Sequence, residues 1–65
     1  MFKLEFTTSN AAFGDERDPE YVQRVDKLRE VNRIMQNVIK EIAYGKTDGS
    51  IMDVNGNKIG KWSLD

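Results

Sequence analysis

The sequence predicts a single α+β domain spanning residues 1–65, in which one long helix packs on a small three-stranded sheet. Three observations lead to this fold class. Apolar and polar residues alternate near the N-terminus, apolar residues recur every three or four positions in the middle, and Asn-Gly lies between two strand-like runs near the C-terminus. The expected order is strand, helix, strand, strand, with the last two strands forming a hairpin in an antiparallel or mixed sheet.

The first element is a strand with one buried face. Phe2, Leu4 and Phe6 alternate with polar residues, which is the period-2 pattern of such a strand. Residues 8–18 form a connector rich in turn-forming side chains. Phe13 interrupts this connector, and we expect it to plug one end of the core; if it stays exposed, it becomes a contact residue.

The second element is a helix over residues 19–44. Asp18 is suited to cap its free N–H groups, and Pro19 fits the first helical position. Gly45 supplies a left-handed stop. Such a helix is about 39 Å long.

One stripe of this helix is predicted to face the sheet, because its apolar residues follow a 3–4 spacing. The stripe comprises Tyr21, Val25, Leu28, Val31, Met35, Val38 and Ile42. Ile34, Ile39 and Ala43 widen it. The opposite surface, predicted to be solvated, carries Lys27, Arg29, Glu30, Arg33, Gln36, Lys40 and Glu41.

The C-terminal residues predict a hairpin that turns at Asn55-Gly56. Asp53 can accept hydrogen bonds from the N–H groups that follow it. A two-residue loop is one possibility, but a three-residue loop with a bulge at Gly56 pairs Asp53 with Asn57 and is preferred, since it places Ile51 opposite Ile59. A second bulge is then needed at Gly60-Lys61 to turn Trp62 inward.

Trp62 is expected to anchor the core, because a buried indole removes a large area from water. The alternative is an exposed tryptophan that acts as a binding hot spot. The whole predicted core consists of Phe2, Leu4, Phe6, Leu28, Val31, Met35, Val38, Ile42, Ile51, Ile59, Trp62 and Leu64.

Composition argues against several kinds of chemistry. The chain has no cysteine and no histidine, which excludes disulfides and the usual zinc sites. Asp53, Asn55 and Asn57 resemble the start of a calcium loop, but glycine falls at position 4 and Leu64 at position 12, so we expect no metal and no other cofactor. A serine or threonine nucleophile would lack its usual base, and we expect no enzyme activity.

The predicted helix is longer than the sheet, whose strands span about 20 Å. Its N-terminal half should therefore keep apolar surface that something covers. A second copy in a symmetric homodimer is preferred, and the alternative is that residues 8–13 fold back over it. The candidate partner-binding residues are Phe13, Tyr21, Val22, Arg24, Val25 and Leu28.

Two motifs resemble those of short uncharacterised proteins of bacteriophages, prophages and other mobile elements. They are N-A-A-F at residues 10–13 and G-x-I-x-D-x-N-G-N-x-x-G-x-W at residues 49–62. The resemblance implies the same order of elements and attaches no catalytic residue. It implies a non-enzymatic accessory protein in the cytoplasm of a bacterial host cell, acting by protein–protein binding as an inhibitor or modulator of a host or defence complex.

Two alternative functions stay open. One is a nucleic-acid-associated regulator that uses a basic strip of Lys27, Arg29, Arg33 and Lys40. A net charge of −1, from 10 basic and 11 acidic residues, argues against nucleic acid as the partner. The other is a structural or assembly accessory that only self-associates. We expect no membrane partner, because no stretch approaches the roughly 20 apolar residues of a spanning helix.

Overall fold

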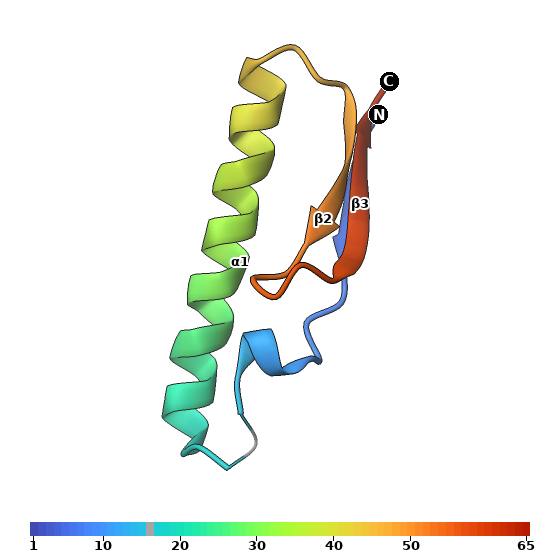
Figure 1. The fold of residues 1–65 in the computed structure, drawn as a ribbon. Helices are drawn as coiled ribbons and strands as arrows, with labels where there is room; N and C mark the ends of the chain where they lie inside the picture. The colour runs from blue at the N-terminus through green and yellow to red at the C-terminus, as the bar shows by residue number, and fades with distance from the viewer. Residues whose placement is uncertain (16) are drawn as a thin grey trace.

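The computed structural model describes residues 1–15 and 17–65 and confirms the α+β class. Its two layers are a helix and a three-stranded sheet, and the molecule is elongated, 40 × 20 × 17 Å (Figure 1). The elements are β1 (Phe2–Phe6), a 3₁₀ turn η1 (Ala11–Phe13), α1 (Glu20–Ala43), β2 (Asp48–Met52) and β3 (Lys58–Leu64).

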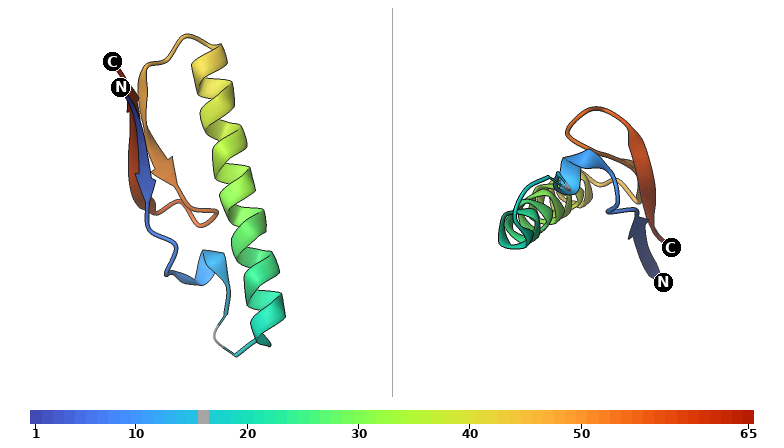
Figure 2. Two further views of the ribbon diagram at one scale, coloured as in Figure 1. Left: turned by 180° about the vertical axis from the view of Figure 1, so that it is seen from behind. Right: turned by 90° about the horizontal axis from the view of Figure 1, so that it is seen from below.

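The sheet is antiparallel throughout, in the order β1-β3-β2. β3 is the central strand, and Trp62 on it lies opposite Leu4 of β1 and Gly49 of β2. The two chain termini therefore meet at one end of the sheet (Figure 2). β1 and β2 are the two edges.

The hairpin turn agrees with the preferred loop, but the second bulge lies one residue earlier than predicted. The Asp53 N–H donates to the Asn57 carbonyl at 2.9 Å, and Gly56 has φ +84°. Ile51 lies opposite Gly60 rather than Ile59. On the other side of β3, Gly60 pairs with Phe6 of β1, and a Cβ on Gly60 would overlap the Glu5 carbonyl oxygen, which accounts for glycine at this position.

α1 is one continuous helix of 24 residues. Its N-cap position is held by Pro19, so the prediction that Asp18 caps the helix is wrong; the Asp18 carbonyl instead accepts a bond from Gln23 Nε2 at 2.7 Å. Gly45 ends the helix as predicted, with φ +89°. The N–H of Gly45 bonds the Ile42 carbonyl and that of Lys46 bonds the Glu41 carbonyl, which completes a Schellman motif.

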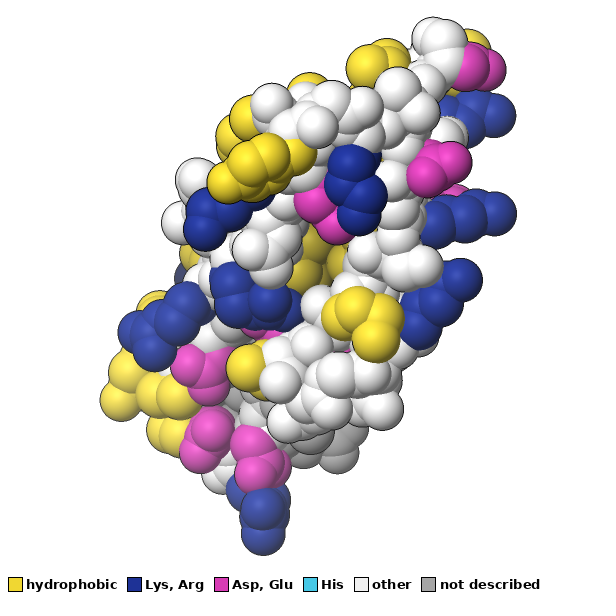
Figure 3. Space-filling model, turned by 45° about the horizontal axis from the view of Figure 1, so that its top comes forward, with side chains coloured by type: hydrophobic (Ala, Val, Ile, Leu, Met, Phe, Trp, Pro, Cys, Tyr) yellow, Lys and Arg dark blue, Asp and Glu magenta, His cyan; other side chains and the backbone are white. Residues whose placement is uncertain are grey.

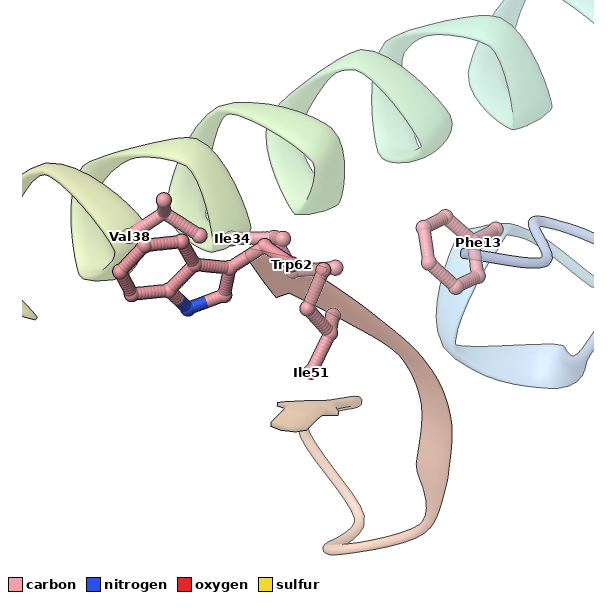
Figure 4. Packing of buried hydrophobic residues seen from close by; sticks show 5 residues of the cluster. All are labelled: Phe13, Ile34, Val38, Ile51 and Trp62. Atoms are coloured by element: carbon pink, nitrogen blue, oxygen red, sulfur yellow. The ribbon is translucent and has the colours of Figure 1, made fainter. Parts of the chain in front are cut away.

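Among the residues that the structure describes, five side chains form the buried core: Phe13, Ile34, Val38, Ile51 and Trp62. Figure 4 shows four of them together between α1 and the sheet, while Phe13 lies apart beneath earlier turns of the helix. Trp62 is 1% exposed and is the core anchor that the sequence predicted. Phe13 is the predicted plug and stacks on Phe6 with ring centroids 6.3 Å apart.

Several residues assigned to the core lie at the surface instead. Leu28 is 63% exposed, and Phe2, Met35, Ile42 and Leu64 are each more than a third exposed. The helix turns Ile34 and Val38 toward the sheet, and this rotation carries Leu28, Met35 and Ile42 outward. Phe2 and Leu64 pair with each other at the end of the sheet, where the strands stop.

Candidate functional site

The outer side of α1 carries a row of exposed apolar residues along its whole length. We call it the outer row: Tyr21, Val25, Leu28, Met35, Ile39 and Ile42. Their exposed fractions run from 38% to 69%. Hydrophobic side chains gather at the lower left of Figure 3, on the side of α1 away from the sheet. Asn32 is exposed and lies in the one gap of the row.

The inner side of α1 is already covered by the chain itself. Ile34 and Val38 contact the sheet, while η1 packs against the N-terminal half of the helix (Figure 2). Gly14, directly after η1, lies so close to α1 that a Cβ on it would be 3.3 Å from Gln23 Cα. The alternative in which residues 8–13 fold back therefore describes the inner side, and the outer row remains exposed.

The predicted partner-binding residues separate into three environments. Tyr21, Val25 and Leu28 belong to the outer row, and Arg24 is exposed beside them. Val22 is half-buried. Phe13 is 2% exposed, so its inclusion among accessible contact residues is wrong.

The C-terminal half of the row, with Met35, Ile39 and Ile42, was missed as a surface. Met35 and Ile42 were assigned to the core because their spacing matches that of a packed helix face. That spacing was the right signal. It is shared by two adjoining apolar faces: Val31 and Val38 turn toward the sheet, while Met35 and Ile42 turn outward.

The hairpin turn is held by Asp53, which is 4% exposed. Its carboxylate accepts bonds from the N–H groups of Asn55 and Asn57 at 2.9 and 2.8 Å, and from the side-chain amides of Asn57 and Asn10. These donors, the Asn57 N–H first, hold the pKa of Asp53 below its ordinary value. The carboxylate oxygens thus serve the turn rather than a cation.

Two acids predicted to be solvated face the sheet. Glu30 is 6% exposed; it accepts a bond from the Val54 N–H at 3.0 Å and a bidentate pair from Arg33. Glu41 accepts the indole N–H of Trp62 at 2.7 Å. Each acid reaches inward because a donor on the hairpin needs an acceptor there.

The Arg33 guanidinium therefore bonds groups within its own chain and stabilises the fold. Besides Glu30, it donates to the Met52 carbonyl at 3.0 Å, and the Glu30 carboxylate raises the pKa of its guanidinium. Of the predicted basic strip, Lys27, Arg29 and Lys40 remain exposed. The strip is thus weaker than the sequence indicates.

A groove of about 530 Å³ lies between α1 and the edge strand β2. Ile34, Val38 and Ile51 contribute to its floor, and Lys40 and Lys46 lie at its rim. Figure 3 shows this hollow with hydrophobic atoms at its base and charged side chains around it. Lys46 Nζ lies 3.5 Å from Glu41 Oε1, so these two charges are paired with each other. The groove therefore offers a ligand chiefly its apolar floor.

Comparison with known proteins adds no relative: no family model, no curated protein and no solved structure matches the chain. The resemblance to phage and prophage proteins accordingly stays a prediction. Over residues 1–15 and 17–65, no helix combines the length and apolarity needed to cross a bilayer.

Proposed function

We propose that this protein acts without catalysis, by binding another protein through the outer row of α1. The observation that carries the proposal is the line of six exposed apolar side chains on a helix whose other side is already packed. Their exposed area amounts to roughly 500 Å², which is within the range of the largest apolar patch on a typical monomer, and such patches are often functional.

The shape of the surface favours a protein as the partner. The row is a narrow ridge along one helix, and such a ridge fits an apolar groove or another helix. Arg24 and Arg29 flank it. Arginine beside aromatic and aliphatic side chains is a common composition of protein interfaces.

The setting we propose is the cytoplasm of a bacterial cell, with the protein serving as an accessory of a phage or other mobile element. In that setting the protein would act on a host protein, as an inhibitor or modulator of a host or defence complex. Only the two sequence motifs at residues 10–13 and 49–62 support this setting.

Site-specific photo-crosslinking in bacterial cells tests the binding surface. A photoreactive amino acid replaces Leu28 or Ile39 on the row, or Val54 on the hairpin as a matched control, since Val54 is 65% exposed but lies off the helix. We expect protein adducts from Leu28 and Ile39 that are absent from Val54. Equal labelling at all three positions, or none above that of Val54, would remove the outer row as the functional surface.

A further inference from the structure

We infer that the partner on the outer row is a second copy of this chain, aligned in parallel as a two-helix coiled coil. This inference rests on the proposed function and names its partner. The evidence for it is the order of residue types along the row, because an apolar patch that binds an unrelated protein needs no such order.

The outer row and Asn32 together follow a heptad. Position a holds Val25, Asn32 and Ile39. Position d holds Tyr21, Leu28, Met35 and Ile42. β-Branched residues at a, with leucine among the residues at d, favour parallel two-stranded coiled coils.

Asn32 sets the choice of partner. It lies near the middle of α1, where an apolar groove of another protein would leave its amide without hydrogen bonds. A second copy in parallel register presents the same amide at the same height, and an amide both donates and accepts. A single asparagine at an a position fixes register and the two-stranded state in this way.

The geometry leaves room for the second copy. Ile34 and Val38, which pack on the sheet, lie on average about 110° round the helix from the outer row. The two sheets would therefore lie outside the helix pair, one on each side. The outer rows would bury roughly 1,000 Å² in total, which is the size of a weak interface, so we expect reversible association with a dissociation constant of about 10–100 μM.

The flanking arginines make the orientation testable. In a parallel pair, Arg24 at position g faces Arg29 at position e of the other copy, which places like charges together. Arg24→Glu turns both symmetry-related pairs into salt bridges, so the dissociation constant should fall by about two- to tenfold. An antiparallel pair brings g residues next to g residues, and the same change would then produce no tightening through Arg29.

Sedimentation equilibrium from about 1 μM to 1 mM measures association directly. We expect a reversible dimer for the unchanged chain and for Val54→Lys, and at least about tenfold weaker association for Leu28→Lys and Ile39→Lys, which would each bury a charge in the seam. Circular dichroism checks that α1 persists in all variants. A monomer at 1 mM, or equal association of Leu28→Lys and Val54→Lys, would overturn the inference.

Disulfide trapping checks the alignment, since the chain contains no cysteine of its own. Under air oxidation, Tyr21→Cys should link to itself across a parallel pair. Linkage only between Tyr21→Cys and Ile39→Cys chains, which pairs a d position with an a position, would show the antiparallel arrangement and refute the parallel one. If the chain proves monomeric while Leu28 still crosslinks a different protein in cells, the proposed function stands and this inference fails.

Discussion

Replacing Trp62 by alanine is the strongest perturbation of the fold that the structure indicates. The indole is 1% exposed, and Figure 4 shows it packed with Ile34, Val38 and Ile51. Truncating a buried tryptophan to alanine costs about 3–5 kcal/mol. Glu41 would also lose the indole N–H, but its side chain is 31% exposed, so water replaces that donor at small cost.

This loss is a large fraction of the total free energy of unfolding. A domain of this size is stable by roughly 3–10 kcal/mol. With a urea m value of about 1 kcal/mol/M, the midpoint should fall by about 3 M or more, and a weakly stable chain would already be unfolded in buffer. Trp62→Phe keeps an aromatic ring but loses the N–H donor, so its urea midpoint should lie between those of the unchanged chain and Trp62→Ala.

Far-UV circular dichroism during urea titration is the suitable assay, because α1 supplies most of the signal and the variants lack the tryptophan fluorophore. Val54→Ala is the control, since Val54 is 65% exposed; its midpoint should move by less than about 0.5 M. A midpoint for Trp62→Ala equal to that of Val54→Ala would refute the burial of the indole.

Three further predictions concern the contacts around the sheet. Gly49→Ala should lower the free energy of unfolding by about 1–3 kcal/mol and shift tryptophan emission to the red, because the added Cβ would lie 2.6 Å from Trp62 Nε1. Ser50→Ala is the control, and an emission spectrum of Gly49→Ala no different from that of the control would contradict this. Glu30→Ala should cost about 1–3 kcal/mol and speed amide exchange at Val54, whose N–H loses its acceptor, and slow exchange there would contradict the contact. The pKa of Asp53 is depressed in the folded state, so its contribution to stability is full above the ordinary aspartate value of about 3.9 and is lost as pH falls through the folded pKa. Urea midpoints measured from pH 5 to 2 should therefore drop less for Asp53→Asn than for the unchanged chain. Parallel curves for the two proteins would count against the hydrogen bonds to the Asp53 carboxylate.

The elements that local sequence determines could be predicted. The alternation at Phe2–Phe6, the Gly45 stop and the Asn55-Gly56 turn each act through residues a few positions apart, and the structure contains all three. Asp53 was also predictable as the residue that fixes the turn, because its N–H donors follow within four residues.

The rotation of α1 could not be predicted, because the helix has two apolar faces that share a 3–4 spacing. The inward face also carries Glu30 and Glu41, whose hydrogen-bond partners Val54 and Trp62 lie 24 and 21 residues away along the chain. Charged residues are usually assigned to solvent, and that rule failed at both positions. The need for glycine at position 60 could not be predicted for a similar reason, since the close contact there comes from β1 at the other end of the chain.

Methyl NMR with a soluble paramagnetic agent, recorded at about 10 μM and 1 mM protein, tests most directly whether α1 has one face packed on its own chain and another reserved for a partner copy. Ile34 and Ile51 methyls should be shielded from the agent at both concentrations, while Ile39 and Leu28 methyls should relax quickly when dilute and become shielded when concentrated. Quick relaxation of Ile34, or shielding of Ile39 at both concentrations with the chain still monomeric, would contradict the account.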